Sequence, residues 1–228
     1  MPGLTRAATI ILAKELRTEF RTRELLSTTV VFVLMVVVLF SFTFDPTAAE
    51  SRRFGPGLLW LAFLFAGSLM LHPSFMREQV NDTLAALRLA PIEPFAILTG
   101  KILANFLFML FAEFLLLPVF AVLYDVHLLP FASRLLPLVG VLMLGTLGLT
   151  TTGTVFSAVA SQARMRELLL PLLLLPVLTP VLIASAEATA GLLGDPPVLE
   201  RVWLLFLVAF DIVFLTATWL FGEYLLEE

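Results

Sequence analysis

The chain has 228 residues, of which 60% are hydrophobic and only 14% are charged, and its mean hydropathy is +1.01. Soluble domains carry about 25% charged residues, so this composition excludes an ordinary soluble protein. The formal net charge of −4 says little about partners, among which we expect no nucleic acid, and the absence of cysteine excludes disulfide exchange, thiol catalysis and thiolate metal sites.

Residues 1–24 form a charged segment before the first apolar run, and we expect no cleavable signal there. Apolar side chains recur at every fourth position and form one stripe of a helix. This stripe consists of Ala8, Leu12, Leu16 and Phe20. Lys14, Arg17 and Arg21 fall on the opposite face, as in a helix that lies in the bilayer surface. We expect an interfacial amphipathic helix, either a simple anchor or a lever that carries motion from a cytoplasmic partner into the first span.

Six apolar stretches follow, each long enough to cross a bilayer. They are residues 25–44, 54–72, 102–124, 135–160, 168–186 and 202–222. Spanning helices need about 20 apolar residues, because backbone groups find no water partners in hydrocarbon. All 14 lysines and arginines lie outside these stretches. The sequence therefore predicts an all-α polytopic membrane protein in which residues 1–228 form a single transmembrane domain.

The fifth stretch contains Pro171, Pro176 and Pro180. Proline removes a backbone donor and clashes with the preceding turn, but neighbouring helices can satisfy the freed carbonyls in a membrane. We therefore expect a kinked or re-entrant helix over residues 168–186.

Basic residues are distributed unevenly over the connections. Both termini of a six-span chain share one side, and the segments on that side carry ten lysines and arginines, against four on the other. The positive-inside rule places both termini in the cytoplasm. The extracytoplasmic connections, about 45–53, 125–134 and 189–201, are too short for a folded domain.

The longest cytoplasmic connection, residues 73–101, has the pattern of a short capped helix. The run 81–83 supplies good N-caps, and Pro91 disfavours helix just before it. Leu84 and Leu87 would share one face. Such a helix suits a docking element for a cytoplasmic partner, with a solvated loop helix as the alternative. The residues that we assign to coupling are Arg77, Glu78, Asn81, Asp82, Thr83, Leu84, Leu87, Arg88 and Pro91.

Two acidic residues lie midway along spans, Glu113 in the third and Asp211 in the sixth. A charge at that depth costs about 3 kcal/mol on insertion scales. With no basic residue predicted inside a span, neutral partners such as Asn105 or the threonines of the fourth span are expected, with the carboxyl ionised or protonated. These residues form either an interhelical hydrogen bond, a polar element that shifts during a working cycle, or a contact to a partner subunit.

The fourth span is rich in glycine and hydroxyl side chains. Small residues at this spacing allow close helix approach, so we favour packing over a substrate path. The residues that we assign to packing are Gly145, Gly148, Thr152, Gly153 and Ser157. His127 follows the third span and His72 ends the second. They are too far apart for a metal motif, and we interpret His127 as structural, with a heme contact as the alternative.

Several short motifs follow one another along nearly the whole chain. They are Lys14-Glu15-Leu16-Arg17, Arg23-Glu24, Phe42-Thr43-Phe44-Asp45-Pro46, Gly55-Pro56-Gly57-Leu58-Leu59-Trp60, the 77–91 loop, Gly100-Lys101 and Leu144-Gly145-Thr146-Leu147-Gly148. Together they resemble the cytochrome c maturation permease family (CcmB, heme exporter protein B). The chain departs from the family's Asp-Gly-Ser/Thr-Leu-Glu pattern at 81–85, and His72-Pro73 stands where many members have an acidic residue.

The resemblance implies an ABC-2 (type V exporter-like) permease of the bacterial inner membrane, in which two copies pair with two copies of a separate ATPase subunit. This chain has no phosphate-binding loop and so no ATPase activity of its own. The implied partners are a heme-handling membrane protein and a periplasmic heme chaperone. No directly bound cofactor is expected; heme is handled or transported, and ATP acts through the partner.

The resemblance leaves the task of the complex open between heme export and release of the loaded chaperone. We favour release, since no heme ligand set is visible. A generic exporter of a drug, lipid or saccharide and a passive scaffold for assembly factors are the alternatives.

Overall fold

The structure is a computed structural model that describes residues 3–43, 49–80, 94–124, 134–160 and 166–227. Seven helices and no strand occur in these ranges. They are α1 (Leu4–Thr22), α2 (Glu24–Thr43), α3 (Ala49–Val80), α5 (Pro94–Leu123), α6 (Leu136–Ala160), α7 (Arg166–Leu193) and α8 (Arg201–Glu227). All except α1 contain a stretch long and apolar enough to cross a membrane. The predicted all-α polytopic fold is thereby confirmed.

The candidate spans lie close to the predicted ones, with one informative difference. Their bounds are Glu24–Thr43, Phe54–Leu71, Phe95–Leu123, Leu136–Ala160, Leu170–Leu193 and Arg201–Gly222. The third span begins at residue 95 rather than 102, so Lys101 lies inside it, and Arg201 opens the sixth. The expectation that every basic residue lies outside the spans is therefore wrong at these two positions. For Lys101 the physical reason is a carboxylate from α1, described below.

Helix α7 contains all three prolines of the fifth span and still runs unbroken from Arg166 to Leu193. A re-entrant segment needs a break at which the chain turns back, so that alternative is wrong. The inward face of α7 consists of buried side chains spaced by three or four residues. They include Leu170, Leu174, Leu178, Val181, Ala184 and Ala188. This spacing keeps one stripe against the bundle; Pro171 lies at its edge, and Pro176 and Pro180 are exposed.

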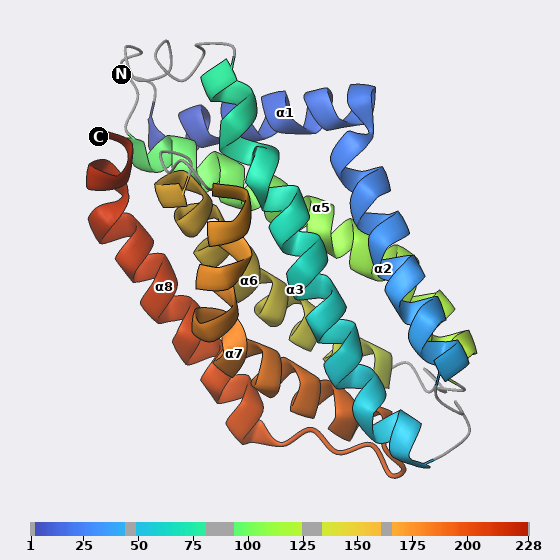
Figure 1. The fold of residues 1–228 in the computed structure, drawn as a ribbon. Helices are drawn as coiled ribbons and strands as arrows, with labels where there is room; N and C mark the ends of the chain where they lie inside the picture. Colours follow the sequence, from blue (N-terminus) through green and yellow to red (C-terminus); the bar gives the residue numbers. More distant parts are fainter. Residues whose placement is uncertain (1–2, 44–48, 81–93, 125–133, 161–165, 228) are drawn as a thin grey trace.

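Helix α1 lies across one end of the bundle (Figure 1). The start of α1, the end of α3, the start of α5 and the end of α8 share this end (Figure 1). Gly100 of α5 lets α1 approach closely, because a Cβ there would lie 2.7 Å from the Ile11 Cβ and 2.9 Å from the Ala8 carbonyl oxygen. Ala8 and Ile11 are accordingly buried.

Of the predicted apolar stripe of α1, Ala8 is buried against the bundle, whereas the Phe20 side chain is 69% exposed. A step of four residues overshoots a helical turn by about 40°, so three such steps carry Phe20 about 120° away from Ala8. The buried face instead continues through Glu15, whose side chain is only 15% exposed, and Glu19, at 1%. The inward face of α1 is therefore partly acidic.

Helix α6 is enclosed by α3, α5, α7 and α8. Gly145 of α6 packs directly against the ring of Trp60, and its missing side chain also leaves room for the Ser185 hydroxyl. Trp60 is fully buried, and its indole N–H donates to the Thr189 hydroxyl at 3.0 Å. Further along α6, Gly153 packs against Leu71. Small residues on α6 thus make space for large ones on α3.

We predict that Gly145→Ala destabilises the protein by about 1–3 kcal/mol, because the new methyl group overlaps the Trp60 ring. Thermal unfolding of the detergent-solubilised protein measures this as a lower midpoint. Gly140→Ala is the matched control on the same helix, since nothing lies within 4 Å of its Cβ position. Alanine there stabilises the helix slightly or changes nothing. Equal midpoints for the two variants would contradict the packing described above.

Candidate functional site

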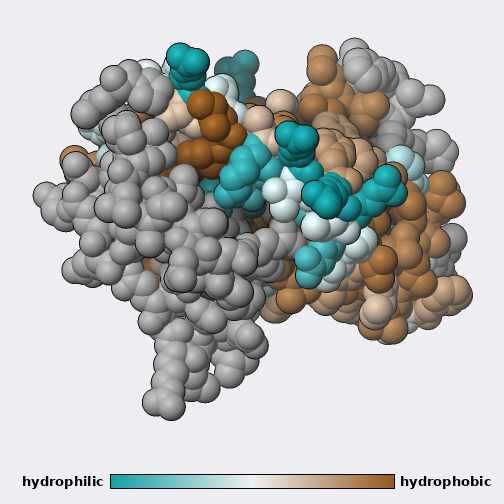
Figure 2. Space-filling view, turned by 90° about the horizontal axis from the view of Figure 1, so that it is seen from above, coloured by the Kyte–Doolittle hydropathy of each residue, from teal (hydrophilic) through white to brown (hydrophobic). Residues whose placement is uncertain are grey.

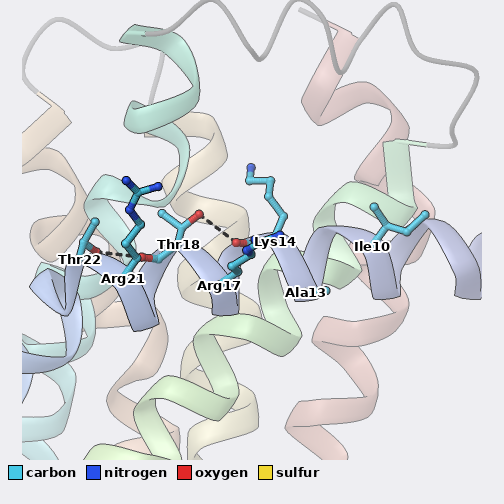
Figure 3. A pocket seen from close by; sticks show the side chains of 7 residues that line it. All are labelled: Ile10, Ala13, Lys14, Arg17, Thr18, Arg21 and Thr22. Atoms are coloured by element: carbon cyan, nitrogen blue, oxygen red, sulfur yellow. Dashed lines mark hydrogen bonds between the residues drawn. The ribbon is translucent and has the colours of Figure 1, made fainter.

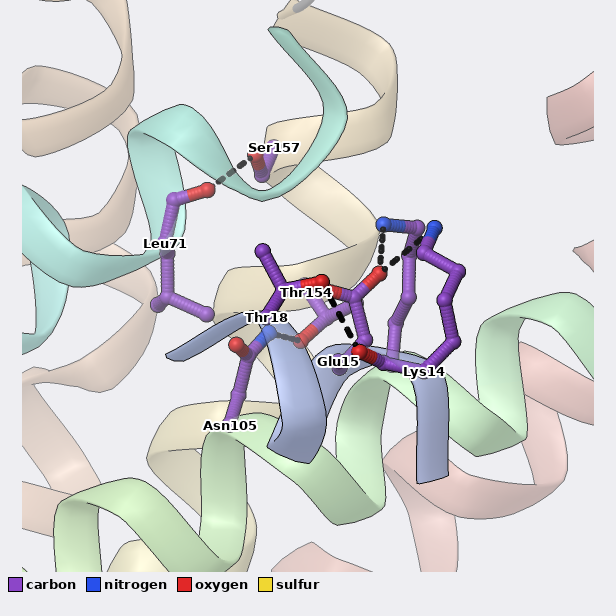
Figure 4. Close-up of polar contacts among 8 residues, drawn as sticks. Lys14, Glu15, Thr18, Leu71, Asn105, Thr154 and Ser157 are labelled. Carbon is purple, nitrogen blue, oxygen red and sulfur yellow. Dashed lines mark hydrogen bonds and ion pairs between the residues drawn. The ribbon is translucent and has the colours of Figure 1, made fainter. Parts of the chain in front are cut away.

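A buried ion pair joins α1 to α5. The Lys101 ammonium lies 3.0 Å from Glu15 Oε1, and the Lys14 ammonium lies 3.1 Å from the same oxygen (Figure 4). The Lys101 side chain is 0% exposed. The pair joins two of the motifs noted in the sequence, residues 14–17 and 100–101, although its members are 86 residues apart. Neither motif alone indicated that they meet.

The negative charge of Glu15 offsets the free-energy cost of burying the Lys101 ammonium. Removing an ammonium group from water costs several kcal/mol unless a counter-charge and hydrogen bonds offset it. Burial of the Glu15 carboxyl acts to raise its pKa, but the positive charges of Lys101 and Lys14 outweigh burial and hold that pKa below its ordinary value. Glu15 is therefore an anion at neutral pH.

A second carboxylate of α1 holds the start of α2. Glu19 Oε1 accepts a hydrogen bond from the backbone N–H of Leu26 at 2.8 Å. A negative charge is favourable there, because the first amides of a helix are unsatisfied and carry its positive dipole end. Between the helices the chain turns at Arg23 alone, which adopts a left-handed conformation with φ 55° and donates its N–H to the Glu19 carbonyl at 2.6 Å. The connection between α1 and α2 is thus one residue long, and hydrogen bonds to Glu19 hold it.

The outer face of α1 is basic. Lys14, Arg17 and Arg21 line a shallow surface depression of about 480 Å³ together with Ile10, Ala13, Thr18 and Thr22 (Figure 3). Seen from this end of the molecule, hydrophilic side chains gather near the middle of the face (Figure 2). No acidic residue is among the described residues that line the depression. This surface suits an acidic partner.

Polar contacts also link the spans to one another. Asn105 of α5 donates from Nδ2 to the Thr154 hydroxyl of α6 at 3.0 Å. Ser157 of α6 donates to the Leu71 carbonyl of α3 at 2.8 Å (Figure 4). Each bond crosses between helices inside the bundle, where interhelical bonds contribute about 0.6–2 kcal/mol. They fix the register of α6 against α3 and α5.

The two acidic residues of the spans have different surroundings. Glu113 is fully buried, and its Oε1 accepts a hydrogen bond from the Thr146 hydroxyl at 2.6 Å. Asp211 lies against α6, where a Cβ on Gly148 would be 2.9 Å from its Oδ1. Within the described residues, neither oxygen of Asp211 has a hydrogen-bond partner. Positions 146 and 148 point about 200° apart on a helix, so the two carboxyls lie on opposite sides of α6. They do not form one acid–base pair.

The remaining predicted residues have the following places. Gly148 and Thr152 are buried on α6, and Arg77, Glu78 and His72 belong to helix α3. Others lie outside the described residues: Asn81, Asp82, Thr83, Leu84, Leu87, Arg88, Pro91 and His127. In the described part of the chain, no three histidines or acidic residues come close enough to hold a metal ion.

Sequence reasoning missed Glu15, Glu19 and Lys101 as a functional group. Two signals could have revealed them. Glu15 and Glu19 are four residues apart and so share one face of α1. Lys101 stands between the apolar runs 95–98 and 102–104, which reads as a helix that continues through it. An acidic face on one helix and a lone basic residue in another are complementary.

Comparison with known proteins gives a consistent result over the length of the chain. The family model described as CcmB protein matches residues 6–221. The chain is 34% identical over 203 residues to heme exporter protein B of Pseudomonas aeruginosa, and the aligned residues make up 88% of each chain. It is 36% identical over 177 residues to the protein of that name from Rhodobacter capsulatus, and the aligned residues make up 78% of this chain and 79% of the relative. The Paracoccus denitrificans protein of that name is 33% identical over 196 residues, or 85% and 88% of the two chains.

We predict that Glu15→Gln destabilises the protein by about 3–5 kcal/mol, because it removes the carboxylate charge that lies 3.0 Å from the buried Lys101 ammonium. Thermal unfolding in detergent at pH 7 measures the loss. Glu200→Gln makes the same chemical change on an exposed side chain between α7 and α8 and should leave the midpoint unchanged. A midpoint of Glu15→Gln equal to that of the control would show that the pair contributes nothing.

The contribution of Glu15 also depends on pH. Because the folded-state pKa lies below the ordinary one, this contribution is complete above the ordinary carboxyl value, about 4.3, and is lost as the pH falls through the folded-state value. The difference in unfolding midpoint between the wild type and Glu15→Gln should therefore be largest near pH 7 and shrink toward pH 3. A difference that stays constant over this range would contradict the assignment.

Proposed function

The chain belongs to the CcmB protein family, and on that basis we propose that it is the membrane subunit of an ABC transporter complex for c-type cytochrome biogenesis. The curated relatives named heme exporter protein B support this proposal, since the alignment covers most of each chain. The six candidate spans suit a permease. The subunit is non-catalytic, and a separate ATPase subunit hydrolyses ATP, because the sequence has no phosphate-binding loop.

The ATPase docks at the end of the bundle where α1 lies. In this proposal the 77–91 segment receives the ATPase through Leu84 and Leu87, and both termini are cytoplasmic. The end of α3 and the start of α5, which flank the segment, lie at the same end as α1 (Figure 1). The excess of basic residues in the segments of this end is the observation that favours the cytoplasmic orientation. Two copies of the chain pair with two ATPase subunits.

ATP hydrolysis serves to release the heme-loaded periplasmic chaperone, which works with a heme-handling membrane protein. The packing of α6 favours release over passage of heme through the interior of one subunit. Trp60 fills the space beside Gly145, and Leu71 fills the space beside Gly153. These two large side chains are fully buried. Opening a path for a planar macrocycle there would break the contacts that hold α3 against α6.

We predict that the double change Leu84→Asp and Leu87→Asp weakens binding of the ATPase by at least about 100-fold, because two apolar anchors of about 1.5–3 kcal/mol each become charged. Co-purification and ATP hydrolysis of the reconstituted complex measure the loss. Val198→Asp is the control, since this exposed valine lies in the connection between α7 and α8 and not at the docking segment.

Unchanged ATPase binding and hydrolysis in the double variant would refute the docking role of residues 77–91. Chaperone release that proceeds equally with and without ATP would instead favour a passive scaffold. Hydrolysis that responds to a drug, lipid or saccharide and not to the loaded chaperone would favour a generic exporter.

A further inference from the structure

Two carboxylates on the inward face of α1, Glu15 partly buried and Glu19 buried, bind two different spans. Glu15 pairs with Lys101 of α5 at 3.0 Å, and Glu19 accepts the backbone N–H of Leu26 in α2 at 2.8 Å. The residues are four apart, so both side chains leave α1 on the same side. Helix α1 thereby connects the first turns of α2 to the early part of α5 through charged contacts.

Both connections are stiff. At the α5 end, the absence of a side chain on Gly100 brings the Ala8 carbonyl and the Ile11 Cβ against the α5 backbone. At the α2 end, Arg23 is the single residue between the two helices, and its N–H is bonded to Glu19. Sliding or rotation of α1 would expose or unpair a buried charge, which is costly in a low-dielectric interior. The helix is therefore held in one position relative to both spans.

Helices α2 and α5 also contact each other directly. A long hydrogen bond between them runs from the Ser41 hydroxyl to the Leu123 carbonyl at 3.5 Å, at the far end of both helices. Apolar surfaces in lipid have no hydrophobic drive to stay together. Near α1, the charged contacts of Glu15 and Glu19 add to this direct packing and join both helices to α1.

The position of these contacts along the chain indicates a function for them. Helix α5 begins at Pro94, directly after the proposed docking segment, and Lys101 is about two turns further on. A displacement of the start of α5 therefore acts on Lys101 over a short length of helix. We propose that α1 is a rigid strut, with Glu15 and Glu19 as its positioning residues, that makes α2 move together with α5 when the ATPase displaces the docking segment. This inference rests on the function proposed above.

The test measures distances between helices in the complete complex with the ATPase in lipid. The chain contains no cysteine, so pairs of cysteines can carry spin labels without background. Val31 on α2, Phe111 on α5 and Ile212 on α8 are exposed positions for them. Distances are recorded without nucleotide and with ATP bound to a hydrolysis-deficient ATPase.

In the otherwise unchanged chain, the 31–111 distance should stay constant within about 2 Å, whereas the 31–212 distance should change by about 5 Å, the scale of a one-turn shift. With Glu15→Gln the 31–111 distance should become dependent on nucleotide. Exchange of the charges, Glu15→Lys with Lys101→Glu, should restore a constant distance, which a merely destabilised chain would not do. Glu200→Gln is the matched control and should behave as the unchanged chain.

Three outcomes would overturn the strut. These are a 31–111 distance that varies in the unchanged chain, a 31–212 distance that does not respond to ATP, and a Glu15→Gln variant that keeps α2 and α5 together. Each of them leaves the proposed function standing if the complex forms and hydrolyses ATP. Failure of the ATPase to bind the unchanged chain would instead remove the proposed function and the strut with it.

Discussion

A lysine ammonium buried inside a membrane-spanning helix needs a counter-charge, and in this protein that counter-charge comes from outside the bundle. Lys101 is enclosed completely, and Glu15 of α1 supplies the carboxylate. Because breaking a buried charge pair costs about 3–5 kcal/mol, the contact favours α1 lying across the end of the bundle with its acidic face inward. The position of the helix, the close approach at Gly100 and the burial of Glu19 all accord with this contact.

Close packing and charged contacts occupy different parts of the bundle. Along α6, glycines and hydroxyl groups meet Trp60, Leu71 and Asn105, so its contacts are close, and Thr154 and Ser157 form hydrogen bonds to neighbouring helices. Charged contacts lie at the ends of the bundle, those of Glu15 and Glu19 at the α1 end and the Arg134–Asp195 pair, at 3.3 Å, at the opposite end. Such a division suits a subunit that receives motion from a partner and has no chemistry of its own. Membership of the CcmB protein family is consistent with this division.

Much of this arrangement could be predicted from the sequence, and the exceptions have specific causes. The apolar runs predicted the six candidate spans, and Lys14, Arg17 and Arg21 were predicted on the outer face of α1, where the depression lies. The face of α1 that packs against the bundle was not predicted, because the apolar stripe drifts around the helix and Phe20 is exposed. The predicted third span begins too late, because Lys101 falls in the predicted cytoplasmic connection. An ion pair within a span cannot be recognised while its partner is unknown.

Hydrophobicity and length are properties of each segment by itself, so the sequence alone determined the all-α class, the six candidate spans and the amphipathic helix before them. The partners of the buried polar groups depend on which helices become neighbours. Glu15 meets Lys101 across 86 residues, Glu113 meets Thr146 across 33, and Asp211 faces Gly148 on the opposite side of α6. Only the tertiary structure decided these pairs, because the choice of neighbour follows from how all the helices pack together and not from any one of them.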